Sequence, residues 1–245
     1  MDDRAAPATS APLDLDRFGL RRYLESLKGS NQLEIVETPV ALADVAARLS
    51  GSENAIWFKN AGGSELVGNV VGSRERLARA FGAPTHDVTL EVERRLKNKP
   101  EIVELASHAA PVHQVVQTGD AVDVTALPVH LQHALDGAPF ISASIDFTLD
   151  PANGKTNVGM RRMMLRGRKE TGVDLNAPSD LRVIYTAAAA RGEKLPVSFV
   201  VGCHPIDAVA ATMKEAGDAL ALLASLRGSA AAGREVHHQR DSRAG

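Results

Sequence analysis

The stretch from Asp150 to Gly167, read as DPANGKTNVGMRRMMLRG, constrains the fold of this chain more than any other. Its first five residues contain a proline, which fixes φ, and an Asn-Gly pair, which supplies a residue that tolerates positive φ. This turn chemistry separates two runs of residues that favour strands, 140–149 and 158–165. The sequence therefore predicts an antiparallel β-hairpin whose arms contain these two runs.

The second arm of the predicted hairpin is polar for a strand that would only fill a core. It carries an amide and four guanidinium groups, from Asn157, Arg161, Arg162, Arg166 and Arg168. Guanidinium groups bind anions through a planar fork, and the glycine among them lets a ligand approach the backbone. The arm favours an anionic ligand, and the alternative is a solvated strand face rich in arginine.

Composition excludes several classes of protein. The chain has 245 residues, of which 44% are hydrophobic and 24% charged, which is ordinary for a globular protein. The net charge of −2 and the 4% aromatic content argue against a nucleic-acid partner. No apolar run reaches the length of a membrane span, and the polar start of the chain does not resemble a signal peptide. We therefore expect a cytoplasmic enzyme with no membrane partner.

The first half of the chain alternates helical and strand-like patterns. A serine is placed to cap a helix that a glycine follows, and a Gly-Gly pair separates two strand-like runs. The predicted helices are 13–27, 40–49, 74–81 and 86–98, and the predicted strands are 33–36, 55–58 and 66–71. Such alternation is typical of an α/β domain.

The second half is richer in valine, isoleucine and threonine. The segments 112–124 and 140–165 favour several strands in succession, which indicates an antiparallel sheet or a barrel. Downstream, the pattern predicts helices over 180–190, 206–213 and 218–226, and a buried strand over 196–201. The single cysteine, Cys203, excludes an internal disulfide framework.

The order of several motifs resembles one enzyme family over most of the chain. These motifs are LRRYLESLKGSNQLEIV, LVGNVVGSRERLARAFG, VVQTGDAVDVTALPVHLQHALDGAPFISASI, the hairpin sequence above, LPVSFVVGCHP and LASLRG. From about Leu15 to Gly228 the chain resembles the N-terminal half of the UbiD family of reversible decarboxylases, which use prenylated FMN. The Asn-Val-Gly-x-x-Arg element at Asn157 to Arg162 is the specific part of the match.

The resemblance implies an α/β (α+β) protein. An N-terminal α/β domain is followed by an incomplete split β-barrel, like that of flavin reductases, which binds the cofactor. We expect a disordered lead over 1–12, the first domain over 13–110, the cofactor domain over 111–228 and a disordered tail over 229–245.

The resemblance also assigns roles to residues of the hairpin. Asn157 matches an asparagine that binds a divalent metal, and the alternative is an asparagine that satisfies its own turn. Arg162 matches the catalytic arginine that orients the substrate carboxylate, and the alternative is a surface ion pair. The cofactor-binding residues implied by the match are Val158, Gly159, Met160, Arg161 and Arg162. Arg161 stands where many members have tyrosine, which implies a more polar pocket.

The chain departs from the family at the other two metal ligands. The family histidine falls at or near Asp180, which is either a substituted ligand or the first turn of a helix, where a carboxylate favours the dipole. The family glutamate falls at Ala219. Asp218 is adjacent, but one step along a helix turns a side chain by about 100°. The resemblance implies prenylated FMN with Mn²⁺, and K⁺ as a further cation, and these departures weaken the expectation of a metal.

After Gly228 the sequence SAAAGREVHHQRDSRAG shows no apolar period. Codons for residues 233–239 can be chosen that, read one base later, encode Val-Val-Lys-Cys-Ile-Thr-Asn, which is how the family continues. We hypothesise that the chain is a frameshifted, truncated copy without the family's proton-donating glutamate and its partner. Sequencing the coding region tests this hypothesis.

These inferences predict a UbiD-type carboxy-lyase that acts reversibly on an aromatic, heteroaromatic or α,β-unsaturated carboxylic acid and is impaired in this form. The expected partners are the acid substrate, a flavin prenyltransferase that supplies the cofactor, and further copies in a homo-oligomer. Two alternatives stay open at this point. One is an inactive flavin-binding remnant, and the other is a split-barrel flavin oxidoreductase.

Overall fold

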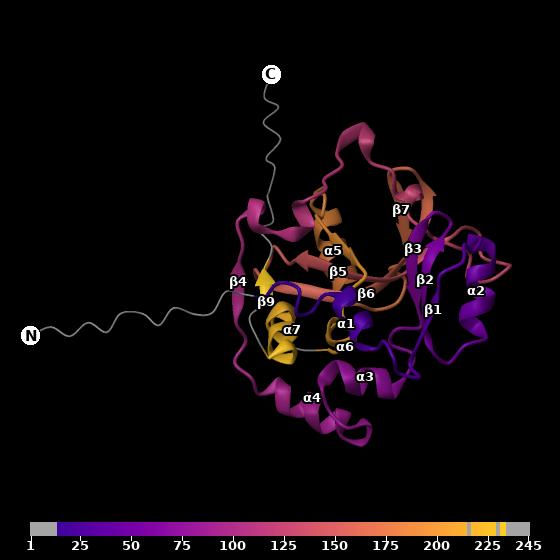
Figure 1. Cartoon of the computed structure of the whole chain (residues 1–245). Coiled ribbons are helices and arrows are strands. Elements are labelled where there is room, and N and C mark those ends of the chain that lie inside the picture. The colour runs from indigo at the N-terminus through magenta and orange to yellow at the C-terminus, as the bar shows by residue number, and fades with distance from the viewer. Residues whose placement is uncertain (1–13, 215–216, 229–230, 234–245) are drawn as a thin grey trace, which may run out of the picture.

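The structure is a computed structural model that describes residues 14–214, 217–228 and 231–233 (Figure 1). Its described strands form three sheets, with the orders β1-β2-β3, β4-β9 and β7-β6-β5-β8. None of the described helices has both the length and the apolar character needed to cross a membrane. The mixed α/β class expected from the sequence is confirmed.

The first sheet lies at one side of the molecule with α2 beside it (Figure 1). Strands β1 (Leu33–Val36) and β2 (Ala55–Ala61) pair in parallel, and β2 and β3 (Ser64–Gly68) pair antiparallel. Strand β2 reads as a run of buried residues because apolar clusters lie on both of its faces. The strands and the Gly-Gly turn predicted here are confirmed, although β3 begins and ends earlier than predicted.

The first half of the chain also contains four α-helices, α1 (Leu20–Ser26), α2 (Leu42–Ser50), α3 (Arg74–Phe81) and α4 (Val88–Leu96). The predicted helix over 13–27 is wrong in its first part. Gly19 precedes α1 in an extended conformation, and its N–H is bonded to the carbonyl of Asp16 in a turn. This turn prevents the helical pattern from starting upstream of Leu20.

Helix α3 has the ends that the sequence predicts. The Ser73 hydroxyl accepts the backbone N–H groups of Glu75 and Arg76, and Gly82 closes the helix in the left-handed region at φ +65°. Glycine adopts this conformation without the steric penalty of a side chain, so it ends the helix at low cost.

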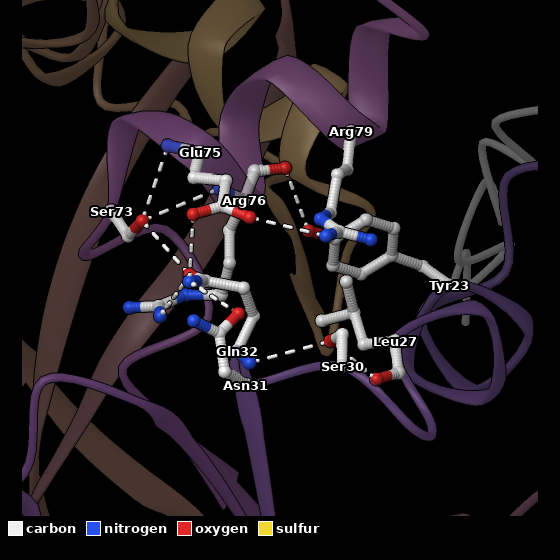
Figure 2. A network of polar contacts seen from close by, with 9 residues as sticks. All are labelled: Tyr23, Leu27, Ser30, Asn31, Gln32, Ser73, Glu75, Arg76 and Arg79. Atoms are coloured by element: carbon white, nitrogen blue, oxygen red, sulfur yellow. Dashed lines mark hydrogen bonds and ion pairs between the residues drawn. The ribbon is translucent and has the colours of Figure 1, made fainter.

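Helix α3 also carries a guanidinium into the interior of this region (Figure 2). Arg76 is 1% exposed. Its three nitrogens donate to the Val70 carbonyl at 3.2 Å, the Gln32 Oε1 at 3.1 Å and the Asn69 carbonyl at 2.9 Å. The buried cation is therefore bonded at every nitrogen by a neutral oxygen.

The segment that connects the two larger sheets contains β4 (Ile102–Glu104) and four short 3-10 turns, over 107–109, 111–113, 119–121 and 124–126. The strands predicted over 112–124 are wrong. Val112, Val115 and Val116 are exposed there, and no neighbouring strand pairs with this stretch among the described residues. A segment rich in residues that favour strands does not become a strand when no neighbouring strand pairs with it.

The four-stranded sheet consists of β5 (Phe140–Leu149), β6 (Thr156–Gly167), β7 (Glu170–Val173) and β8 (Ser198–Val201), all paired antiparallel. The predicted hairpin is confirmed as β5 and β6. The described strands form an open sheet and no closed barrel. The strand predicted as buried over 196–201 is instead an edge strand, in which Val201 is 56% exposed.

Three more helices follow, α5 (Asp180–Ala190), α6 (Pro205–Thr212) and α7 (Ala219–Arg227). Strand β9 (Ala231–Gly233) then pairs in parallel with β4, so the tail predicted as disordered contains a strand. The rest of that tail, apart from these three residues, lies outside the described residues, as does the lead over 1–12. One apolar cluster joins residues of α3 and α4 to residues of α6 and α7, so it combines both halves of the chain.

Candidate functional site

Strand alternation divides the motif on β6 between the two faces of the sheet. Successive side chains of a strand point to opposite faces, so Asn157, Gly159 and Arg161 share one face. The other face carries Val158, Met160 and Arg162. Val158 and Met160 belong to an apolar cluster with Ile145, Phe147, Cys203, Ala211 and Ala219. The first face of β6 is thus the polar one, and the second packs on helices α6 and α7.

The polar face holds a carboxylate that the sequence reasoning missed. Asp146 lies on β5 directly opposite Gly159 and is 0% exposed. Its Oδ2 accepts a hydrogen bond from the Asn157 Nδ2 at 3.4 Å, and its Oδ1 lies 3.4 Å from the Arg161 Nε. Burial raises the pKa of the Asp146 carboxyl above its usual value, and the Arg161 charge opposes that rise. A single charged residue within the strand-like run FISASIDFTL was the sequence signal for it.

Several polar atoms on this face have no hydrogen bond within the described residues. They are Asp146 Oδ1, Arg161 Nε and Thr148 Oγ1, which are buried. Thr148 lies opposite Asn157 across the two strands and is 1% exposed. A buried polar group without a partner costs free energy, so such groups are rare in structural cores. The polar face therefore differs from an ordinary sheet interior.

Arg162 is not brought together with Asn157. Its side chain is exposed on the opposite face, where its guanidinium carbon lies 5.2 Å from the centre of the Phe140 ring. Its guanidinium forms no ion pair with a described carboxylate, so the surface ion pair considered as its alternative role is absent from the described residues. The planar group is free to bind an anion from this face.

The other residues considered as metal ligands have separate environments. Asp180 is exposed at the first turn of α5. Asp218 caps α7 through its Oδ1, while its Oδ2 accepts the Thr156 backbone N–H at 2.8 Å, so it ties α7 to β6 beside Asn157. Within the part of the chain that the structure describes, no three or more His, Cys, Asp or Glu side chains are grouped to hold a metal ion.

One cavity, of about 670 Å³, lies in the first half of the chain and is lined by Arg76 and the polar residues around it. The other, of about 1250 Å³, is mainly apolar and extends from β5 and β8 to the segment 104–113. Thr148 and Thr156 line the apolar cavity, whereas Asn157, Arg161 and Arg162 line neither. The predicted site residues thus lie on the sheet beside the apolar cavity and not inside it.

Comparison with known families matches both halves of the chain. The description "3-octaprenyl-4-hydroxybenzoate carboxy-lyase N-terminal domain" matches residues 24–96. The description "3-octaprenyl-4-hydroxybenzoate carboxy-lyase Rift-related domain" matches residues 103–239, which include the hairpin and extend past Gly228.

Two curated relatives are decarboxylases. The chain is 29% identical over 211 residues to anhydromevalonate phosphate decarboxylase of Methanosarcina mazei, covering 85% of this chain and 48% of that protein. It is 28% identical over 210 residues to phenolic acid decarboxylase of Bacillus subtilis, covering 78% and 44%. The chain spans about half the length of the curated relatives it matches.

Among solved structures, the fold matches the UbiD-class enzyme HmfF from Pelotomaculum thermopropionicum in complex with FMN. The TM-score is 0.82 and the identity 24%, over 90% of this chain and 51% of that one. An evolved dimeric form of the same enzyme, in complex with prFMN, gives the same TM-score and identity over 90% and 53% of the two chains. The open four-stranded sheet and its helices thus occur in a larger flavin-binding chain.

Proposed function

The chain belongs to the UbiD family of carboxy-lyases, and from that premise we propose that its β5–β6 hairpin is the prenylated-FMN and substrate site of a non-oxidative, reversible decarboxylase. The observation that carries the proposal is the Asn157–Arg162 element, which lies on one uninterrupted strand inside the matched region. The relatives named as decarboxylases of phenolic acid and of anhydromevalonate phosphate support a carboxylic acid substrate that is aromatic, heteroaromatic or unsaturated.

The residues present fit an anionic flavin in part. The backbone of Val158, Gly159, Met160 and Arg161 on β6 would lie against the cofactor. The exposed guanidinium of Arg162 would bind and orient the substrate carboxylate through its planar fork. The bound flavin would supply the electron sink for loss of CO₂, while these residues hold the reactants in place.

The fit to a metal is weaker. The Asn157 Oδ1 accepts no hydrogen bond from a described residue, so it can serve as an oxygen ligand for Mn²⁺ or K⁺. Asp180 would be its carboxylate partner on α5. Asp218 is engaged as a helix cap and Ala219 packs in an apolar cluster, so neither replaces the family glutamate.

That incomplete metal set favours a second candidate, a flavin-binding protein that does not turn over. In this alternative the hairpin holds the cofactor without releasing CO₂. We also propose that the protein assembles as a homo-oligomer, for which the dimeric form of HmfF is the supporting observation. A flavin prenyltransferase would supply the cofactor in either case.

Coexpression with a flavin prenyltransferase in medium containing Mn²⁺ tests the proposal. The purified protein is expected to retain stoichiometric prenylated FMN, identified by absorbance and by the mass of the released cofactor. It is also expected to release CO₂ from aromatic acids. Arg162→Ala should abolish CO₂ release, while Arg168→Ala, which removes an exposed guanidinium in the turn between β6 and β7 that pairs with Asp123, should not.

Retained flavin without CO₂ release from a panel of acids would support the second candidate. NAD(P)H oxidation by the flavin-loaded protein would support an oxidoreductase instead. A colourless, folded protein would contradict both flavin proposals.

A further inference from the structure

The carboxylate of Asp146 is buried in the middle of the polar face of the hairpin. It touches two residues of the family element, Asn157 and Arg161, and it faces a third, Gly159, across the strand pair. We propose that Asp146 is a positioning residue that fixes which end of the Asn157 amide is presented to a ligand and holds the Arg161 guanidinium on the same face. The proposal rests on the proposed function, because it concerns the same site.

The orientation of the amide follows from hydrogen-bond chemistry. An ionised carboxylate can only accept hydrogen bonds, and an amide has a donating nitrogen and an accepting oxygen. The Asn157 nitrogen therefore faces the Asp146 Oδ2, at 3.4 Å, because the amide oxygen would be repelled there. The oxygen is turned away from the carboxylate, and in this orientation the amide can bind a hard cation or accept a hydrogen bond.

Without the carboxylate, the two ends of the amide are nearly equivalent in size, and the charge left on this face, the Arg161 guanidinium, is positive and does not hold the amide nitrogen. An amide presented with its nitrogen outward would repel a cation. Partners that orient a ligating side chain in this way typically change metal affinity by about 10–100-fold when they are removed. Asp146 thus acts on the ligand through Asn157.

Gly159 provides the space in which the carboxylate sits. A Cβ at this position would lie 3.0 Å from the Asp146 Oδ1 and 3.4 Å from the Arg161 Nη2. The absence of a side chain at Gly159 therefore leaves room for a carboxylate and a guanidinium side by side between two strands. The Arg161 Nη1 also donates to the Met160 carbonyl at 3.3 Å, which further fixes that side chain.

The pairing also separates the two neighbouring arginines. Arg161 is 20% exposed in its side chain and is held by Asp146 on the polar face. Arg162 is exposed on the other face and pairs with no described carboxylate. Only the second guanidinium is then free for a substrate carboxylate.

The first test measures the hydrogen bonding of the Asn157 amide directly and requires no ligand. In the 245-residue protein, the Asn157 side-chain NH₂ signals are assigned by their loss in Asn157→Ser and followed by solvent-exchange NMR. In the parent protein their exchange with solvent should be slow. In Asp146→Asn and Asp146→Ala their chemical shifts should change and their exchange should become fast. Gly159→Ala, which crowds the carboxylate, should have the same effect. Asp120→Asn, at an exposed carboxylate that pairs with Lys169, is the matched control and should leave them unchanged.

Fast exchange in the parent protein, or unchanged signals in the folded Asp146 variants, would overturn the proposal. If Asp146→Ala does not fold, the near-isosteric Asp146→Asn and the Gly159→Ala protein decide the outcome. The second test titrates Mn²⁺ in the presence of FMN, with free Mn²⁺ measured by electron paramagnetic resonance. Asp146→Asn should bind at least about tenfold more weakly than the parent protein and Asp120→Asn.

The two tests separate this proposal from the proposed function. Parent protein that binds neither FMN nor Mn²⁺ would contradict the proposed function in this chain, while the NMR result would still decide whether Asp146 positions the amide. Undiminished Mn²⁺ binding in folded Asp146→Asn would overturn the positioning role and leave the proposed function standing.

Discussion

Arg76 in the first half of the molecule and Asp146 in the second are both buried charged side chains, and their hydrogen-bond partners differ. In the first half, the buried Arg76 donates from all three nitrogens to neutral oxygens at 3.2 Å or less. Figure 2 shows one of these acceptors, Gln32. In the second, Asp146 has one hydrogen bond of 3.4 Å and an ion pair of 3.4 Å, and its Oδ1 is left without a hydrogen bond.

Such a difference separates a structural group from a functional one. A buried charge whose hydrogen-bonding capacity is filled stabilises one arrangement of the chain around it. A buried charge that is only partly satisfied costs stability, and it is retained where its position serves a ligand. We therefore expect Arg76 and Asp146 to respond in opposite ways to removal of their charge.

The largest expected effect is at Arg76. Arg76→Met keeps the apolar part of the side chain but removes three hydrogen bonds of a buried guanidinium. The Val70 carbonyl loses its donor, while the Asn69 carbonyl keeps the Gly72 N–H and the Gln32 Oε1 keeps the Ser73 hydroxyl. We expect the free energy of unfolding to fall by about 3–5 kcal/mol, measured by urea denaturation. Arg79→Met, on the same helix but at an exposed guanidinium that pairs with Glu75, should change it by at most about 0.5 kcal/mol. A loss at Arg76 no larger than this control would contradict its structural role.

A second buried group in the second half, His204, makes the stability of the fold depend on pH. Its ring packs edge-on against Phe18 and Tyr23, and its Nδ1 accepts the Ile206 backbone N–H at 3.2 Å, so the folded protein requires the neutral ring. Burial is the main cause that lowers its pKa to about 4, with Asp207 opposing the shift. The folded state therefore binds the proton less readily than the unfolded chain, whose histidine has the ordinary value of 6.5.

The stability that depends on a neutral His204 is present above the unfolded pKa and is lost as the pH falls from about 6.5 towards 4. Between about pH 7.5 and pH 4 the loss should be about 3 kcal/mol. His204→Asn retains a side chain that can cap α6 but does not titrate, so urea denaturation at both pH values should show a smaller loss for the variant. Equal losses in both proteins would show that other groups cause the acid sensitivity.

How far the sequence predicted these features depends on the range of the interactions. The hairpin and the ends of α3 follow from neighbouring residues, because a turn or a cap needs only a few positions of chain. The strands predicted over 112–124 failed because a strand requires a partner, and local composition does not supply one. The edge position of β8 was missed for the same reason, since burial of an apolar run depends on what covers it.

The candidate site shows the same limit. The polar character of β6 and the family element at Asn157 were evident from the sequence. Asp146 was not identified as its partner, because that contact depends on the register that places it opposite Gly159. The exposed position of Asp180 and the capping role of Asp218 likewise depend on where helices begin relative to the sheet.

The smallest expected effect on stability is at Asp146, where the result should differ most from the loss expected at Arg76. Asp146→Asn removes a charge that has lost its hydration and gained only two long contacts. A neutral amide of the same size fills the same space without a buried charge. We expect the free energy of unfolding to stay the same or rise by up to about 1 kcal/mol, measured by urea denaturation at neutral pH beside Arg76→Met. Since the same substitution should weaken Mn²⁺ binding, stability and binding would change independently, as expected for a positioning residue. A fall in stability of more than about 2 kcal/mol would instead make Asp146 a structural ion-pair partner of Arg161, equivalent to Arg76 in its role.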